Sequence, residues 1–400
     1  KEDRKPKRKV ACMIGYCGTG YSGMQFNTPQ KTIEGTLFAA FVKAGAISAD
    51  NANDPKKVSL LRAARTDKGV HAACNVISLK LIVEEAGMLD KINSCLPAEI
   101  RLWKIVRTMN SFNPRTSCDS RRYEYLIPTS VFIPSRPGDA LSDRAHEFNQ
   151  NTLLKDSAST FWAELDAHLQ QLRQSEAYCR ITDDTTDLGN IALDRSIPDE
   201  EKPAAAAKMK REKMLREAVH AYKRAYRISP ERLTAIRQTL AIYEGTKNFH
   251  NYTIGQEFKQ ASSKRVIRSF DASEPFLIDG TEWFSLKIHG QSFMLHQIRK
   301  MVAMVMLVML SGCPLDRMQK TFGPTKVNIP KAPSLGLLLE RPVFEQYGLR
   351  AIENGKEALN VDDMADEMQS FKHKYIYDKL YAEEISENTF FTYLGGIEGF

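Results

Sequence analysis

The stretch that decides the fold lies at residues 62–72 and reads RAARTDKGVHA. Asp67 stands between Arg65 and Lys68 in a Thr-Asp-Lys-Gly turn that follows a predicted strand. Two nearby cations favour the ionised form of a carboxyl group, which a nucleophile requires. Asp and Gly are also the residues that ordinary turns favour. These residues alone therefore leave two interpretations open, and they favour an ordinary turn over a catalytic loop.

Strands and helices alternate on both sides of this loop. The spacing of apolar residues predicts strands at 9–16, 76–82, 100–106 and 123–127, and helices at 32–46 and 86–94. A second ordered region repeats the alternation, with helices predicted at 230–243 and 292–310 and strands at 270–278, 284–289 and 335–339. The sequence therefore predicts an α+β fold.

Composition divides the chain into four parts. Residues 1–130 form a first half that contains the loop with Asp67, and residues 229–345 form a second half. Between them, residues 131–228 are rich in Asp, Glu, Lys and Ala and are interpreted as a charged helical insertion. Residues 346–400 are polar and helical and form a C-terminal extension.

The composition limits the classes of protein that this chain can represent. Of its 400 residues, 42% are hydrophobic, which is enough for a substantial core. Lys and Arg number 56 against 49 Asp and Glu, a net charge of +7 that suits a polyanionic partner without specifying one. The seven cysteines are scattered without a Cys-x-x-Cys pair, which argues against a disulfide framework or zinc ribbon and favours a reducing compartment.

Neither a membrane anchor nor a signal peptide is expected. The most apolar segment, residues 301–310, is ten residues long, whereas a bilayer span needs roughly 20. The basic start of the chain, residues 1–9, contains no apolar run. Residues 301–310 are therefore predicted to form a buried helix.

A glycine-rich loop raises a rival interpretation. Residues 18–23 fit G-x-G-x-x-G after a strand, the pattern of a dinucleotide-dependent oxidoreductase. In that fold a helix begins at once, but here it is delayed to Thr32 and Pro29 intervenes. Glycines that form a tight turn beside a binding groove are the favoured explanation.

Two basic segments could either bind nucleic-acid phosphates or simply face solvent. One combines cations with Tyr222 and Tyr226 in the insertion, and comprises Lys208, Lys210, Arg211, Lys213, Arg216, Lys223, Arg224 and Arg227. The other is residues 371–380, FKHKYIYDKL. Each could contact phosphates or form a solvated amphipathic face, and the residues do not decide between the two.

Taken in order, several segments carry a family resemblance. RAARTDKGVHA resembles the Arg-Thr-Asp-x-Gly-Val-His-Ala motif of the TruA-like tRNA pseudouridine synthases. Further matches occur in the same order at residues 15–25, 120–128, 245–253, 287–302 and 332–340. The resemblance spans residues 9–344 apart from the insertion, and it is closest to the eukaryotic nuclear tRNA pseudouridine synthase 1 subfamily, fungal members especially.

The resemblance implies roles for individual residues. Asp67 is the nucleophile, and Arg65 holds the place of the displaced base or orients the loop. Tyr123 stacks on the target uracil, and Leu337 or Leu338 forms the apolar floor of its pocket. Arg299 pairs with the catalytic carboxylate. His296, Arg299 and Lys300 share one helical face, which is expected to line a cleft reaching that carboxylate or a phosphate.

The resemblance also implies the architecture and the partners. The fold is two ferredoxin-like halves joined into one continuous, mostly antiparallel sheet flanked by helices, with Asp67 between the halves. The substrates are tRNA uridines around the anticodon stem, with spliceosomal and messenger RNA as further candidates, and the target base is flipped. Localisation is nuclear, with a mitochondrial form left open. Bacterial relatives are dimers, but the insertion and extension favour a monomer.

The expected chemistry needs no cofactor. No catalytic metal is predicted, because the spacing of His71, His250 and His289 matches no metal signature. A structural zinc is compatible with the resemblance, but the sequence identifies no ligands for it. The alternative to an enzyme is a catalytically silent RNA-binding protein on the same fold, against which the joint presence of Asp67, Tyr123 and Arg299 argues.

Overall fold

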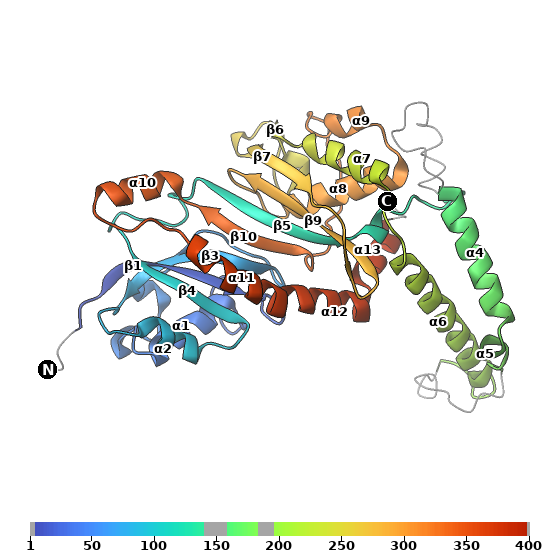
Figure 1. Ribbon diagram of the computed structural model, residues 1–400, viewed down its shortest axis with the longest axis horizontal. Coiled ribbons are helices and arrows are strands. Elements are labelled where there is room, and N and C mark those ends of the chain that lie inside the picture. Colours follow the sequence, from blue (N-terminus) through green and yellow to red (C-terminus); the bar gives the residue numbers. More distant parts are fainter. Residues whose placement is uncertain (1–4, 140–157, 183–195, 398–400) are drawn as a thin grey trace.

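One continuous sheet organises the molecule. The computed structural model describes residues 5–139, 158–182 and 196–397. Its 10-stranded sheet has the order β4-β1-β3-β10-β5-β9-β7-β6, with β2 added to β3 and β8 added to β9 (Figure 1). All pairings are antiparallel except that of β10 with β3. The predicted α+β fold with a continuous, mostly antiparallel sheet is confirmed.

The first half is a β-α-β-β-α-β unit. Its elements are β1 (Arg8–Tyr16), α1 (Ile33–Lys43), β2 (Leu61–Arg62), β3 (His71–Leu81), α2 (Met88–Cys95) and β4 (Ile100–Arg107). Thr32 begins α1 by accepting a hydrogen bond from the Gly35 N–H at 3.1 Å, as its predicted capping role requires. The strand order β4-β1-β3-β2 is the ferredoxin-like arrangement.

The second half repeats that arrangement. Its elements are β5 (Ser120–Pro128), α7 (Pro230–Ala241), β6 (Gly245–Asn248), β7 (Lys264–Ala272), β8 (Phe276–Ile278), β9 (Thr281–Gly290), α8 (Gln297–Ser311), α9 (Leu315–Lys320) and β10 (Leu337–Val343). The order β10-β5-β9-β7 matches that of the first half. Ser229 caps α7, and Pro230 opens it where no backbone donor is needed.

The sheet order assigns β5 to the second half. The predicted division placed residues 120–128 in the first half, which was taken to end at residue 130. In the structure β5 lies between β10 and β9, whose residues come far later in the chain. The insertion therefore follows the first strand of the second half and precedes its first helix. Composition could not reveal this, because the partners of a strand are set by long-range pairing.

The pleat of the sheet separates two faces. On one face Leu37 and Phe41 of α1 pack on Val10 and Ile77, and α8 of the second half packs over Phe284. Tyr123 lies at the junction, partly buried against both apolar clusters. The helices of both halves therefore cover the same face and leave a cleft between them.

C-terminal helices cross the opposite face. They are α10 (Glu345–Glu353), α11 (Ala365–Phe371), a π-helical turn (Lys372–Tyr377), α12 (Asp378–Glu387) and α13 (Thr389–Ile397). In Figure 1 α11 and α12 run beneath the sheet from β3 and β4 toward α13. Phe371 meets Trp103 of the first half at 5.3 Å between ring centroids, and Tyr381 meets Trp283 of the second half at 4.9 Å. These helices therefore tie the two halves together.

A buried ionic network fixes the middle of this crossing. Lys372 lies 3.0 Å from Glu124 and 2.7 Å from Glu340, and the Tyr377 hydroxyl donates to Glu124 at 2.7 Å. Burial opposes the charge on Lys372, but the two carboxylates raise its pKa. Lys372 is thus committed to the interior, whereas His373, Lys374 and Lys379 of the same segment are exposed. For these three side chains, contact with phosphates stays a prediction.

The insertion forms an arm beside the second half. It contains α4 (Ala158–Gln174), α5 (Glu176–Cys179) and α6 (Lys202–Arg224), with α4 and α6 side by side (Figure 1). Phe161 packs on Tyr222 and Tyr226, and the Lys223 amine lies over the Trp162 ring. The two tyrosines of this basic segment therefore hold the arm together.

The charges of the arm do not form one basic face. Lys208, Lys213 and Arg216 are exposed on α6, but Glu212 and Glu217 are exposed beside them. Lys213 lies 3.9 Å from Glu217, one turn along the helix. This mixed surface favours the solvated-face interpretation of the first basic segment.

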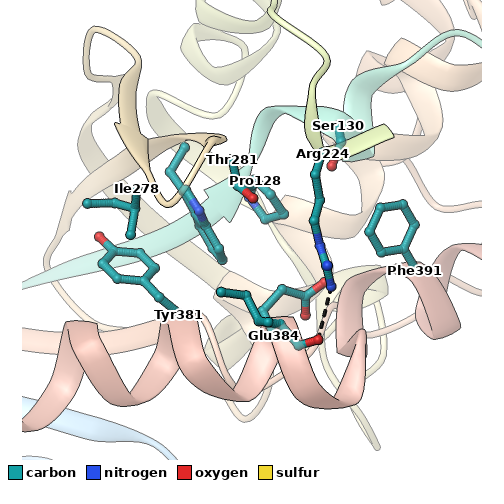
Figure 2. A pocket seen from close by; sticks show the side chains of 10 residues that line it. Pro128, Ser130, Arg224, Ile278, Thr281, Tyr381, Glu384 and Phe391 are labelled. Atoms are coloured by element: carbon teal, nitrogen blue, oxygen red, sulfur yellow. Dashed lines mark hydrogen bonds between the residues drawn. The ribbon is translucent and has the colours of Figure 1, made fainter. Parts of the chain in front are cut away.

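Arg224 anchors the base of the arm. It donates to the Ile385 carbonyl at 3.0 Å and to Asn388 Oδ1 at 2.7 Å, at the C-terminal end of α12. Figure 2 shows Arg224 reaching into a small pocket beside Glu384 and Phe391. A cation at a helix C-terminus satisfies otherwise free carbonyls. The end of the basic segment is therefore structural.

The described residues contain neither a membrane-spanning helix nor a cluster of metal ligands. None of the helices placed in residues 5–139, 158–182 and 196–397 is long and apolar enough to cross a membrane. Across these same ranges, no three His, Cys, Asp or Glu side chains gather as a metal site would require.

The first prediction concerns Glu384. Burial raises the pKa of this carboxyl to about 7, although Arg224 and the Phe390 N–H favour its charged form. The folded state therefore holds a proton more tightly than the unfolded state between the ordinary Glu pKa and about 7, so stability falls as pH rises through that window. Glu384→Gln should raise the free energy of unfolding near pH 8 by up to about 3 kcal/mol.

Calorimetric melting at about pH 5 and about pH 8 measures this effect. The gain in Tm should shrink at the lower pH, where native Glu384 is protonated. Glu387→Gln is the matched control, because Glu387 is exposed on the same helix. An equal gain for both variants, or a gain that does not change with pH, would contradict the assignment.

Candidate active site

The cleft between the halves carries a dense set of cations around one carboxylate. The loop before β3, strand β5 and the loop before α8 provide its walls. Its arginines are Arg62, Arg65, Arg115, Arg121, Arg265 and Arg299. Asp67 is the only acidic side chain among the described residues that line this cleft. The cleft is therefore suited to a polyanion.

A tight turn presents Asp67 at the cleft. The Val70 N–H donates to the Asp67 carbonyl at 3.2 Å, and Gly69 adopts a positive φ of 78° that favours glycine. The side chain of Asp67 is 37% exposed. The two interpretations of this motif are thus compatible: it is an ordinary turn by geometry, and it places its carboxylate in a functional cleft.

The glycine-rich loop supports this turn from behind. The Gly18 N–H donates to His71 Nδ1 at 3.1 Å, and the Met24 N–H donates to the Thr66 carbonyl at 3.1 Å. A Cβ on Gly18 would lie 2.2 Å from the Val70 carbonyl oxygen, and one on Gly23 would lie 3.0 Å from that of Thr66. The glycines therefore permit close packing against the turn that carries Asp67.

Two histidines of the region have structural surroundings. His71 is fully buried, and burial lowers its pKa to about 4, so the neutral ring can accept from Gly18. His250 is also buried, and burial lowers its pKa. Neither histidine lines the cleft.

A buried hydroxyl network holds the other side of the turn. The Tyr16 hydroxyl lies 2.8 Å from Thr66 Oγ1, and Asn75 donates to Tyr16 at 3.2 Å and to the Ala64 carbonyl at 3.0 Å. Asn75 is fully buried. The residues on both sides of Arg65 are thereby anchored to the sheet.

His296 is the basic side chain that lies beside the carboxylate. Its Nδ1 lies 3.1 Å from Asp67 Oδ2, although the contact does not have hydrogen-bond geometry. It precedes α8 with a φ of 60°, a left-handed conformation that is uncommon outside glycine. Burial lowers the pKa of His296, and Asp67 opposes that shift. The imidazole is therefore largely neutral at neutral pH.

Arg299 lies in the cleft but is not paired with Asp67. Its Nε donates to the Ala332 carbonyl at 2.6 Å, and the Ala332 N–H donates back to the Arg299 carbonyl at 3.1 Å. The predicted pairing is therefore not formed in this structure, because the guanidinium is held by the chain before β10. His296 occupies the position beside the carboxylate instead.

Lys300 does not reach the cleft. It is 7% exposed and donates to the Thr253 carbonyl at 3.1 Å and the Asn251 carbonyl at 3.4 Å. Burial lowers its pKa, with Lys326 and Lys331 adding to the shift. The expectation that all three basic residues of this helix face line the cleft is wrong for Lys300, which positions residues 251–253.

Tyr123 and Leu337 form apolar parts of the cleft. The Tyr123 ring meets Phe293 edge to face, at 5.2 Å between centroids and an interplanar angle of 83°. Burial raises the pKa of its hydroxyl to about 12. Leu337 lines the cleft, whereas Leu338 points to the opposite face and is fully buried. Of the two leucines proposed for the floor, the structure places Leu337 there.

Arg121 was missed by sequence reasoning. From β5, it donates to the Ala63 carbonyl at 2.8 Å and to the Gln291 carbonyl at 3.3 Å, so it joins the loops on the two walls. Arg65, in contrast, is exposed at the same cleft. The only available signal for Arg121 was its place in the segment SRRYEYLIP, where three polar residues precede an apolar strand.

Comparisons with known proteins identify the family. A family model described as tRNA pseudouridine synthase matches residues 240–345. A protein of Yarrowia lipolytica named tRNA pseudouridine synthase 1 is 48% identical over 415 residues, which cover 100% of this chain and 76% of that protein. Proteins of that name in Schizosaccharomyces pombe and Saccharomyces cerevisiae are 45% and 46% identical, with 100% of this chain and 84% and 73% of theirs covered.

The chain belongs to the tRNA pseudouridine synthase family. The resemblance drawn from the ordered motifs is confirmed, including its fungal character. The classification as an isomerase of this family is confirmed with it. A protein of Schizosaccharomyces pombe named tRNA pseudouridine synthase 2 is a more distant relative, 34% identical over 98% of this chain and 89% of its own length.

The second prediction tests the glycine support of the turn in this pseudouridine synthase. Gly18→Ala should lower the free energy of unfolding by about 1–3 kcal/mol, because the added Cβ meets the Val70 carbonyl. Hydrogen exchange at residues 66–71 should also accelerate. Gly396→Ala is the control, because nothing lies within 4 Å of a Cβ added there. Native stability and native exchange rates in Gly18→Ala would contradict this packing.

Proposed function

We propose that the chain isomerises uridine to pseudouridine in tRNA, with Asp67 as the nucleophile. The observation that carries this proposal is the single carboxylate in a cleft lined by six arginines, presented on a tight turn and faced by an aromatic ring. The arginines suit the phosphates, and Tyr123 suits the base. The names of the relatives supply the substrate class.

The reaction exchanges one bond to the sugar for another. The bond from the anomeric carbon C1′ to uracil N1 breaks, and a bond from C1′ to uracil C5 forms. The C5 proton is lost and N1 gains a proton, so neither electrons nor atoms are supplied from outside. Asp67 either attacks C1′ or supports departure of the uracil anion, and the closed pocket retains the free base while it turns.

The neutral state of His296 favours this role for Asp67. A charged imidazolium 3.1 Å away would form a full ion pair and reduce the reactivity of the carboxylate. Burial keeps the imidazole largely neutral, so it forms no full ion pair with Asp67. His296 thus positions the carboxylate without neutralising it.

The substrate must present its uridine outside the base stack. Flipping a base costs a few kcal/mol, which contacts between the arginines and phosphates offset. Tyr123 and Leu337 then supply a ring and an apolar floor for the uracil. Arg65 is exposed on the same turn as Asp67 and is free to take the place of the displaced base.

Finer features of the proposal come from the resemblance. The targets are uridines around the anticodon stem, with spliceosomal and messenger RNA as further substrates, and the working compartment is the nucleus. The protein acts as a monomer, because α11 and α12 cover one face of the sheet. Catalysis uses side chains and needs no cofactor.

The third prediction tests the nucleophile. Asp67→Asn and Asp67→Ala should each lower pseudouridine formation on transcribed tRNA by at least about 1,000-fold, because they remove the reacting carboxylate. Carbodiimide-dependent primer-extension stops measure the product and map its positions. Asp90→Asn is the control, because Asp90 is exposed on α2, away from the cleft.

The outcomes separate the proposal from its alternative. Both Asp67 variants should still bind tRNA, because the arginines of the cleft remain. Equal amounts of pseudouridine from the native protein and from Asp67→Asn would rule out Asp67 as the nucleophile. Tight tRNA binding by native protein without product would instead support a catalytically silent RNA-binding protein.

A further inference from the structure

Leu295 is an exposed apolar side chain beside the carboxylate. It directly precedes His296 and is 55% exposed within the arginine-lined cleft. Leu61, from the opposite wall of the cleft, is 38% exposed. Ile254, next to Thr253, is also 55% exposed. Exposed aliphatic side chains gain nothing from a polyanion's phosphates, so their presence needs another explanation.

The neighbours of Leu295 point into the protein. Phe293 packs on Tyr123 at 5.2 Å between ring centroids, and Met294 packs against the main core. Gln297 is 1% exposed and accepts from the Met294 N–H at 2.9 Å. Leu295 is thus an outward-facing side chain in a loop where Phe293, Met294 and Gln297 are anchored.

The backbone of this loop is held rigidly. Thr253 Oγ1 donates to the Leu295 carbonyl at 2.9 Å, and buried Lys300 donates to the Thr253 carbonyl at 3.1 Å. Arg121 donates to the Gln291 carbonyl at the start of the loop. A backbone held this way loses little entropy when its side chain binds, which suits insertion into a stack of bases.

We propose that Leu295 is an apolar wedge that enters the RNA beside the flipped uridine and unstacks the neighbouring base step. The inference rests on the proposed function, since it deepens how that cleft admits its substrate. Proteins that kink nucleic acids insert Leu, Ile, Phe or Met between base steps. Leu295 inserts from the second half, while Arg65 acts from the first half. The two walls thereby open the stack from both sides.

The fourth prediction separates the wedge from a structural role. Leu295→Ala should lower kcat/KM by about 10- to 100-fold for a uridine paired in a stem, because the cost of unstacking is no longer offset. For the same uridine in a single-stranded RNA the loss should be less than about 3-fold, since little stacking must be broken. Leu295→Met should retain most activity on both substrates. Leu277→Ala is the control, because Leu277 is 58% exposed on β8, outside the cleft.

A fluorescence measurement tests the wedge without chemistry. An RNA hairpin with 2-aminopurine beside the target uridine is titrated with Asp67→Asn protein, with and without the additional Leu295→Ala change. Fluorescence should rise on saturation with the single variant and stay low with the double variant. A rise in both, or equal kinetic losses on paired and single-stranded RNA, would overturn the wedge. Failure of the proposed function shows separately, as absence of pseudouridine with native protein.

Discussion

The parallel pairing of β3 with β10 is the constraint on which the rest of the structure depends. It joins Leu338 to His71 and Leu339 to Ala72, and it is the only described pairing that is parallel. Because His71 begins β3, the turn with Asp67 must lie where the two ferredoxin-like units meet. The carboxylate of one half therefore faces the loop before α8 of the other. The short pairing of β3 with β10 thus creates both the continuous sheet and the cleft.

Two sets of interactions stabilise the contact between the two halves. On the cleft side, Arg121 bonds to the carbonyls of Ala63 and Gln291 on opposite walls. On the other side, Lys372 binds Glu124 and Glu340, which belong to β5 and β10. A buried cation that loses its carboxylate partners destabilises the fold. The ion pairs of Lys372 therefore favour one position of the helices across the sheet. Both sets of interactions involve β5, the strand that pairs with β10.

The cleft combines a positive electrostatic potential with an uncharged imidazole beside the carboxylate. Its arginines attract phosphates over a distance, while His296 next to Asp67 is kept neutral by burial. The carboxylate therefore lies in a favourable potential without a tight ion pair. Rigidity completes the arrangement, since Gly18 and Gly23 let a second loop pack directly on the turn. Preorganisation of this kind lowers the cost of reaching the reactive geometry.

The sequence by itself determined the local structure, the family and the position of Asp67 on a turn, because turn chemistry, apolar periodicity and ordered motifs are local properties. It could not determine that β5 belongs to the second half, that Lys300 and Lys372 are interior, or that His296 rather than Arg299 lies beside Asp67. The reach of a long basic side chain depends on which carbonyls and carboxylates other segments bring near it. Ala332, Thr253 and Glu340 are such partners, and only the tertiary structure decided where they lie.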